Sequence, residues 1–549
     1  MNAAALSALS PAETVLAYHA RTKHSLKRYA AGPEALDWDA QPNPFREFEG
    51  CARIELQLDA ERLGTSFAQA CTQGGGVARA SLGIESVASL LQLSMALSAW
   101  KQYGPDRWAV RCNPSSGNLH PTEAYVFSSN VPGLHDGVYH YLSRDHALEL
   151  RCRSNNRLEA PTRLWIGLSS VHWREAWKYG ERAFRYCQLD IGHALAALRY
   201  AAGVLGWGVT LVEDVDSAEL AAMMGIDRSG DFSGAECEDA DLLIAIAATP
   251  GAGPAAEHCP PFARQGSENR WAGRANLLDP HPLYRWPAIE QVSRATRGRS
   301  TGLPFEFPDY PPRRSTDKVR AVDVILGRRS AQRFDSKHRI TADCFYHLLD
   351  SLLDRPNAPW DVWNFAPRLH PVLFVHRVEG LDAGVYALPR RPAAIDALRA
   401  LMRADFEWQA PEGRPAHLPL FRLLRSDCRA VARTMNCHQA IASDSCFSLS
   451  MLGEFEPVVR DNPWRYRQLH WEAGLMGHAL YLEAEAAGLR GTGIGCYFDD
   501  ALHDILGLST TQYQALYHFT VGRPLSDDRI SSSPGYPHRQ APPTRETIP

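Results

Sequence analysis

An arginine-rich segment in the second half of the sequence has the residue types that bind an anion. Residues 328–334 read RRSAQRF and follow the apolar run AVDVILG. Arg328 and Arg329 offer paired donors and a fixed charge, and Ser330 adds a hydroxyl, so the segment suits a phosphate or a carboxylate. Taken alone, the same residues are also typical of a solvated basic turn.

A second segment, residues 113–123 (NPSSGNLHPTE), is rich in residues that form tight turns. Pro114, Ser115, Ser116 and Asn118 would expose many backbone donors and acceptors. Such a surface can hydrogen-bond the edge of a flat heteroaromatic ring. The same composition is also typical of an ordinary surface loop.

Alternating glycines mark a third segment, residues 488–498 (GLRGTGIGCYF). Gly493 and Gly495, with Ile494 between them, would let the backbone lie against a ligand. The spacing is not GxGxxG and lacks the strand-turn-helix context of a dinucleotide fold, which argues against a Rossmann site. No phosphate loop, GxSxG nucleophile elbow or HExxH zinc motif occurs, and we expect no metal.

Lys178 and Tyr179 are adjacent titratable groups in the aromatic segment WREAWKYGERAFRYC. Burial of Lys178 would lower its pKa toward the range of a useful base. The alternative is an ordinary surface lysine beside a packed tyrosine.

The elements that position these residues belong to an ordinary globular chain. Its 549 residues are 45% apolar and 22% charged, with a net charge of -4. This composition excludes disordered, collagen-like and coiled-coil chains and gives no reason to expect nucleic acid or a membrane as partner. With no signal peptide and no apolar run of ~20 residues, we expect a soluble cytoplasmic protein. The twelve cysteines form no CxxC pair, so we expect them to be small buried apolar groups.

Two internal repeats occur in the same order on either side of a Pro- and Arg-rich connector. Residues 133–139 (GLHDGVY) recur as 380–386 (GLDAGVY), and residues 185–207 align without gaps on 467–489, Gly192 on Gly474. Both longer segments are rich in Ala and Leu and predict buried helices. We expect an internal duplication, the alternative being two unrelated core helices. A duplicated chain can imitate a homodimer and form a site between its halves.

Taken together, these segments resemble the FMN-dependent nitroreductase superfamily, and within it the SagB-type dehydrogenases that form thiazoles and oxazoles. PSSGNLHPTEAYV, GVYHY and KYGERAFRY carry the resemblance in the first half, and GRRSAQRF, GTGIGCYFDD and FTVGRPLSDDRI carry it in the second. It implies an α+β fold of two tandem nitroreductase-like domains, each a mixed sheet flanked by helices, packed as an intramolecular pseudo-dimer. We expect an N-terminal lead at residues 1–72, domain 1 at 73–255, the connector at 256–318, domain 2 at 319–530 and an extended or loosely held tail at 531–549.

The resemblance also implies one composite FMN site between the two domains. The first domain would supply the loop of Pro114, Ser115, Ser116 and Asn118; the second would supply Arg328, Arg329, Ser330, Gln332, Gly493, Ile494, Gly495, Arg523 and Arg529. Gln332 stands where the family has a second basic residue, so either Gln332 or the neighbouring Arg333 would complete the phosphate clamp. The counterpart segments of the other interface, residues 79–81 and 361–365, do not match the pattern, and we expect that second site to be lost.

In this branch a Lys-Tyr pair is associated with proton removal as hydride leaves for flavin N5, and Lys178 and Tyr179 fall on that motif, with Lys178 the expected base. The expected function is an FMN-dependent oxidoreductase acting on a heterocyclic or peptide-derived substrate such as an azoline. NAD(P)H or O2 as redox partner, and further oligomerisation, stay open. So do two alternatives: an NAD(P)H-dependent nitro- or quinone reductase, and a non-catalytic flavin-binding or scaffold partner of a peptide-modifying complex.

Overall fold

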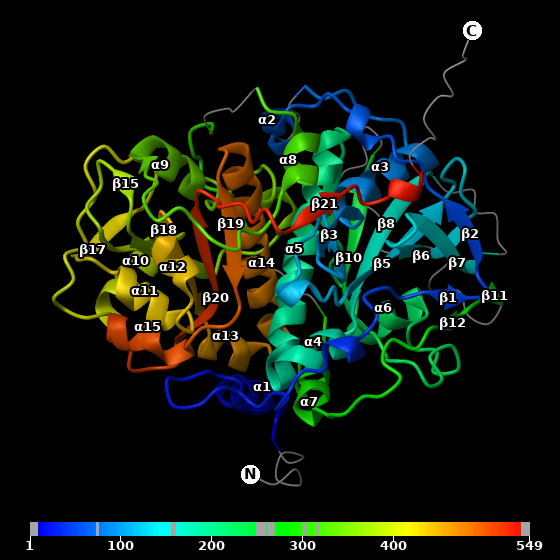
Figure 1. The fold of residues 1–549 in the computed structure, drawn as a ribbon, viewed down its shortest axis with the longest axis horizontal. Coiled ribbons are helices and arrows are strands. Elements are labelled where there is room, and N and C mark those ends of the chain that lie inside the picture. Colours follow the sequence, from blue (N-terminus) through cyan, green and yellow to red (C-terminus); the bar gives the residue numbers. More distant parts are fainter. Residues whose placement is uncertain are drawn as a thin grey trace.

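The computed structural model describes residues 9–72, 76–154, 161–248, 260, 270–299, 305–313 and 318–539. Two large β-sheets lie on either side of a central pair of long helices, with shorter helices around them (Figure 1). The predicted α+β fold is confirmed. Pairing within both large sheets is antiparallel rather than mixed, because hairpins connect several of the paired strands.

The first sheet is built from residues 52–271. Its strand order is β11-β7-β6-β5-β8-β10-β9, and β2 also pairs with β7. All eight residues of β5 (TEAYVFSS) are buried, as expected for a strand rich in aromatic and β-branched residues with both faces covered. The bounds are β2 Ala52–Glu55, β5 Thr122–Ser129, β6 Gly137–Leu142, β7 Ala147–Arg153, β8 Arg163–Ser170, β9 Gly208–Leu211, β10 Asp239–Ala247 and β11 Arg270–Trp271.

The second sheet has the order β17-β16-β14-β18-β20-β19. Strands β17, β16, β14, β18, β20 and β19 can be matched one by one to β7, β6, β5, β8, β10 and β9 of the first sheet. With this matching, the strands follow one another along the chain in the same order in both sheets. In each half, a long helix precedes the edge strand β9 or β19, and a helix of eight residues follows it. The bounds are β14 Leu369–Val375, β16 Gly384–Ala387, β17 Phe421–Arg425, β18 Phe447–Glu454, β19 Arg490–Ile494 and β20 Tyr513–Gly522.

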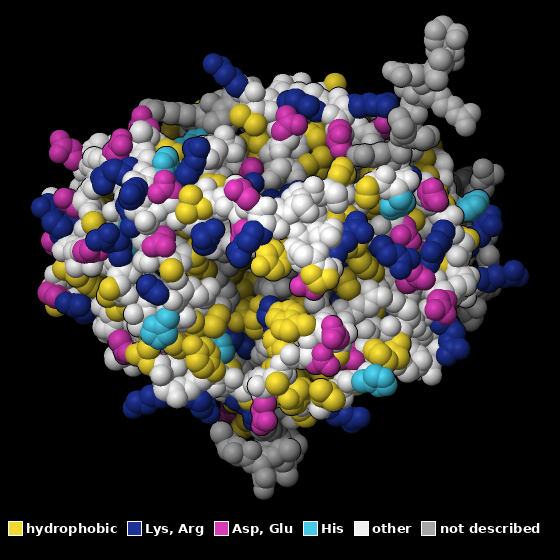
Figure 2. All heavy atoms as spheres, viewed as in Figure 1, with side chains coloured by type: hydrophobic (Ala, Val, Ile, Leu, Met, Phe, Trp, Pro, Cys, Tyr) yellow, Lys and Arg dark blue, Asp and Glu magenta, His cyan; other side chains and the backbone are white. Residues whose placement is uncertain are grey.

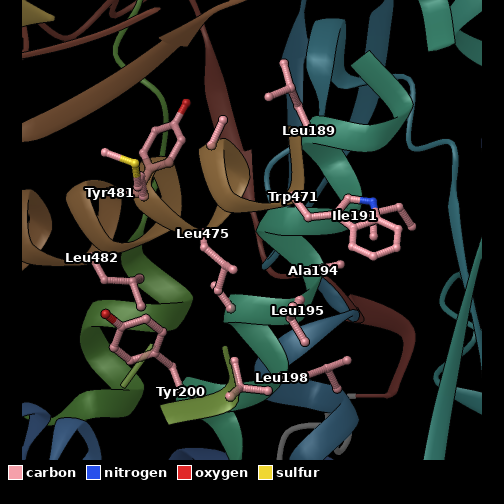
Figure 3. Packing of buried hydrophobic residues seen from close by; sticks show 14 of the residues in the cluster. Leu189, Ile191, Ala194, Leu195, Leu198, Tyr200, Trp471, Leu475, Tyr481 and Leu482 are labelled. Carbon is pink, nitrogen blue, oxygen red and sulfur yellow. The ribbon is translucent and has the colours of Figure 1, made fainter. Parts of the chain in front are cut away.

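The two long helices, α5 (Ala183–Val204) and α14 (Arg465–Ala486), pack against each other in the middle of the molecule. Every residue of α5 is buried. Figure 3 shows Leu189, Leu195 and Leu198 of α5 near Trp471 and Leu475 of α14. The helices cross where each has a glycine: a Cβ on Gly192 would lie 2.2 Å from the Trp471 carbonyl oxygen, and one on Gly474 would lie 2.3 Å from that of Leu189. The crossing therefore requires both glycines.

Shorter helices cover the sheets and the ends of the long pair. Helix α1 begins with a capping box, in which Ser10 and Glu13 each accept a backbone hydrogen bond from the other, and it packs on α7 and α13. The bounds are α1 Pro11–Arg21, α2 Phe67–Cys71, α3 Ile84–Ser94, α4 His172–Tyr179, α6 Ser217–Met224, α7 Pro287–Ala295, α8 Ala321–Gly327, α9 Ala342–Asp350, α10 Pro392–Leu401, α11 Arg429–Met435, α12 Ala440–Asp444, α13 Glu456–Asp461 and α15 Asp499–Leu506.

Parts of the segments expected as connector and tail form regular secondary structure. Within 256–318, α7 buries Ile289 and Val292, and β12 (Arg274–Ala275) pairs with β1 (Phe48–Glu49). After the second domain, β21 (Ser531–Ser533) crosses to the first half and joins β3 (Leu97–Tyr103) and β4 (Asp106–Arg111). Figure 1 shows this red strand lying over the blue-to-cyan half. The remaining parts of both segments lie outside the described residues.

None of the helices in the described ranges has the length and the apolar composition that crossing a bilayer needs.

Candidate functional site

A cavity of about 800 Å³ is walled by both halves of the chain. Its volume falls within the range of small-molecule and cofactor sites, and Figure 2 shows that this face of the molecule is hollowed near its middle. The structure brings twelve of the predicted site residues into its wall: Pro114, Ser115, Ser116, Asn118, Tyr179, Arg328, Arg329, Ser330, Gln332, Gly493, Ile494 and Gly495.

The loop at residues 114–118 is folded sharply enough to present its backbone to the cavity. Gly117 and Asn118 have φ values of 59° and 61°, in the left-handed region. The Asn118 side chain donates to the Ala109 carbonyl oxygen at 2.7 Å, which fixes the loop on β4. A Cβ on Gly117 would lie 2.5 Å from the Tyr179 hydroxyl, so glycine is required there by the tyrosine as well as by the turn.

Two buried carboxyl groups that the sequence interpretation did not assign lie beneath this loop. Asp190, on α5, lines the cavity and accepts hydrogen bonds from the backbone N–H and the hydroxyl of Ser116, both at 3.0 Å. Burial raises the pKa of Asp190 to about 7, and burial together with the charge of Asp190 raises the pKa of Glu175 well above its ordinary value. The signal in the sequence for Asp190 is an acidic residue inside a helix rich in Ala and Leu and predicted to be buried.

The arginine segment sits at the junction of the two halves. Arg328 is buried and donates to the backbone carbonyl oxygens of Cys112 and Arg111, at 3.2 and 3.1 Å, so a second-half residue is anchored on the first half. The Ser330 hydroxyl lies 2.8 Å from that of Tyr481, and Tyr481 in turn accepts from the Gly493 N–H at 2.9 Å. Tyr481 thus joins the arginine segment to the glycine segment.

Further cations complete a positive patch in the wall. Lys101 and Arg490 line the cavity together with Arg329. Burial lowers the pKa of Lys101 and lowers that of Arg329 to about 10, and repulsion between the cations acts in the same direction. The Glu485 carboxylate lies 3.5 Å from Arg490. Cations that depress one another's pKa values would be stabilised by a bound anion, so this wall has the electrostatics of an anion site.

Gly493, in β19, and Gly495, just after it, are also required by the packing of two tyrosines. A Cβ on Gly493 would lie 1.7 Å from the Tyr517 hydroxyl, and one on Gly495 would lie 2.1 Å from the Tyr186 ring. Packing of these two tyrosines therefore explains the glycines directly. The backbone of this segment still lines the cavity.

Three predicted residues do not reach the wall. The Lys178 ammonium lies 5.0 Å from the centre of the Trp38 ring, and burial lowers its pKa as expected. Arg529 is exposed and pairs with Asp527 at 2.7 Å, and Arg523 is exposed at the end of β20. Of the Lys-Tyr pair, only Tyr179 lines the cavity. Burial raises its pKa well above 10, so its hydroxyl is protonated at neutral pH.

The segments at residues 79–81 and 361–365, where a second site was expected to be lost, take part in buried contacts. Trp207 donates to the Ala80 carbonyl oxygen at 2.8 Å, Asp361 forms a buried ion pair with Arg199 at 2.6 Å, and Trp363 is buried. A second, much smaller pocket of about 20 Å³ is lined in part by Leu211 of β9. That space holds about one water molecule.

The chain is similar to known proteins in both sequence and structure. Residues 457–523 match the model of the Nitroreductase family. MJ1384 of Methanocaldococcus jannaschii, a protein named as a nitroreductase, is 30% identical over 136 residues, which are 23% of this chain and 68% of that protein. The trifolitoxin-processing protein TfxB of Rhizobium leguminosarum bv. trifolii is 29% identical over 130 residues, 21% of this chain, and the match spans 35% of TfxB. A crystal structure from Anabaena variabilis, also named as a nitroreductase, has a TM-score of 0.66 at 22% identity and covers 93% of this chain and 99% of its own. That structural likeness concerns the fold.

Proposed function

Because this chain belongs to the nitroreductase family, we propose that the cavity between its halves holds one FMN and that the protein is a flavin-dependent dehydrogenase or oxidase. When bound, FMN would supply the two-electron chemistry by exchanging hydride at N5. The single observation that carries the proposal is the positive patch in the cavity wall, opposite in charge to the flavin's phosphate.

The residues present fit the two parts of such a ligand. Arg329, Arg490 and Lys101 would neutralise the phosphate dianion, with Ser330 as an uncharged donor. Arg328 donates to backbone carbonyl oxygens of the first half, so its role would be to hold the two halves of the site together. The loop at residues 114–118 would hydrogen-bond the edge of the ring, while Tyr186 and Tyr517 keep the Gly493–Gly495 backbone in place.

We further propose that the chain is a tandem duplication whose halves pack as a pseudo-dimer. The equal strand orders of the two sheets support this, as do the contacts at the helix crossing. Gly192 contacts Trp471 and Gly474 contacts Leu189, which is the reciprocal pattern of a twofold interface, since Leu189 aligns with Trp471. The aligned arginines Arg185 and Arg467 also each form ion pairs with the opposite half, although with acids at non-equivalent positions: Arg185 with Asp499 of α15, and Arg467 with Asp239 and Asp241 of β10.

We propose that Tyr179, and not Lys178, is the member of the Lys-Tyr pair that contacts the substrate. Its hydroxyl lies against the loop at Gly117 and in the cavity wall, whereas Lys178 lies 5.4 Å from the Tyr179 ring and outside the wall. Lys178 would act through Tyr179, as a neighbouring cation. Asp190 is a second group of the wall whose pKa suits proton transfer near neutrality.

The substrate class that we propose is heterocyclic or peptide-derived, such as an azoline. Similarity to a protein named for processing trifolitoxin supports a peptide-derived substrate. Similarity to a protein named as a nitroreductase supports the alternative of an NAD(P)H-dependent nitro- or quinone reductase. If NAD(P)H bleaches the flavin absorbance anaerobically at the rate of turnover, the reductase alternative is favoured. If an azoline peptide bleaches it instead, the main proposal is favoured.

Flavin stoichiometry and two arginine variants test the site. We expect purified protein to be yellow and to release one FMN per chain on denaturation. Arg490→Gln should weaken FMN retention roughly tenfold, because it removes a cation from the wall. Arg523→Gln is the matched control, since Arg523 is exposed and off the wall, and it should retain FMN normally. Protein that takes up no FMN would overturn the proposal in favour of a scaffold, and two FMN per chain would overturn the lost second site.

A further inference from the structure

Two cysteines far apart in the sequence meet at the cavity. The Sγ atoms of Cys437 and Cys496 are 2.9 Å apart. Cys496 follows β19 and lines the cavity, and Cys437 follows α11. Both side chains are half-buried, unlike the fully buried cysteines such as Cys428, and so they depart from the expected role of small apolar groups.

The surroundings of Cys496 favour its thiolate. His24, from the N-terminal lead, is a neighbour of Cys496. Its Nδ1 accepts from the Ala30 N–H at 2.8 Å, so in the neutral ring the other nitrogen carries the proton and can donate to the sulfur. The Cys437 thiol, His24 and Arg182 together lower the pKa of Cys496, while the same hydrogen bond raises that of Cys437. A partly exposed thiol whose pKa is lowered by neighbouring donors and a nearby cation is typical of a reactive cysteine.

The turn that carries Cys437 is conformationally unusual. Cys437 and His438 have φ values of 51° and 61°, and left-handed backbone is rare for residues other than glycine. Gln439, two residues further on, donates to the Cys496 carbonyl oxygen at 3.1 Å and also lines the cavity. The turn is therefore held against Cys496 by a second contact, independent of the sulfurs. Strained turns of this kind cluster at functional sites.

We propose that Cys437 and Cys496 form a reversible dithiol–disulfide site in the cavity wall, which low-molecular-weight disulfides oxidise and in which Cys496 is the attacking thiol. The site lies beside the proposed flavin cavity but needs no flavin for its own chemistry. Since Cys496 and Gln439 both belong to the wall, oxidation would tie two wall segments together covalently.

The exchange balances in two steps. The Cys496 thiolate attacks one sulfur of a disulfide RSSR, which forms a mixed disulfide and releases RS⁻. Cys437, after losing its proton, attacks the Cys496 sulfur, which forms the intramolecular disulfide and releases the second RS⁻. The two protons of the protein thiols end on two molecules of RSH, so one RSSR is reduced as one protein dithiol is oxidised.

The test uses the full-length protein as purified, reduced with dithiothreitol and then treated with oxidised glutathione. After denaturation and alkylation, peptide mass spectrometry should show a 437–496 disulfide and the loss of two thiols, both reversed by dithiothreitol. With iodoacetamide at pH 6, Cys496 should react at least about tenfold faster than the buried Cys428. Absence of the disulfide, or equal alkylation rates, would overturn the proposal.

Two serine variants separate the attacking from the resolving thiol. Cys437→Ser should accumulate a stable glutathione adduct on Cys496, because no second thiol can displace it. Cys496→Ser should leave Cys437 largely unmodified under the same conditions. Adducts of equal yield in the two variants would contradict the assigned roles, and near-ultraviolet circular dichroism matching the parent protein would verify that each variant is folded.

Discussion

At the scale of single residues, Asp190 makes a prediction about pH. Burial raises its pKa to about 7, whereas an unfolded aspartate has a pKa of about 3.9. Between these values the folded state holds a proton that the unfolded state has released, so this group lowers stability as pH rises from about 4 to about 7. Asp190→Asn keeps an acceptor for Ser116 but does not titrate. We expect urea unfolding to show the variant gaining about 2–3 kcal/mol relative to the parent between pH 5 and pH 8; parallel pH curves would contradict the shifted pKa.

Some residues of the site could be predicted from the sequence and others could not. Arg329, Ser330 and Ser115 belong to compact motifs whose chemistry is readable from adjacent letters, and the structure brings them to one cavity. Lys101 and Asp190 each stand alone in the sequence. They reach the cavity only through the pairing of β3 with β4 and the packing of α5, which no local pattern encodes.

At the scale of elements, the crossing of α5 and α14 depends on the absence of side chains. In Gly192→Ala, the added Cβ would lie 2.2 Å from the Trp471 carbonyl oxygen, so the helices must separate or bend. We expect a loss of about 1–3 kcal/mol in chemical unfolding. Gly230→Ala is the control, since a Cβ there meets nothing within 4 Å, and its stability should stay within about 0.5 kcal/mol of the parent. Equal stability of the two variants would mean that the crossing tolerates a wider spacing.

Elements with strong periodic patterns were predictable, and those held by partners were not. The Ala- and Leu-rich repeats predicted two buried helices, and α5 and α14 confirm them. By contrast, β21 reads only Ser-Ser-Ser, has no apolar pattern, and forms a strand because the edge of β3 is available to it. Helix α7 was not predicted, because its segment is rich in proline. Its Pro287 stands in the first turn, where a helix tolerates proline.

At the scale of the whole molecule, the chain end fastens the second half to the first beside the cavity. Tyr536 is buried; its hydroxyl accepts from the Leu97 N–H at 2.9 Å and donates to the Ser143 carbonyl oxygen at 2.7 Å. Ser532, a few residues earlier, lines the cavity, so we expect release of this strand to open the wall.

Tyr536→Phe tests that coupling with the ring left in place. The substitution leaves the Leu97 N–H buried without a partner, which costs about 1–3 kcal/mol. We expect thermal unfolding at a lower temperature and, if the anchored strand shapes the cavity, faster loss of bound FMN on dilution. Tyr284→Phe is a suitable control, because Tyr284 lies in the connector, away from the cavity wall. A variant that melts earlier but releases FMN at the parent rate would show that the anchor stabilises the fold without shaping the site.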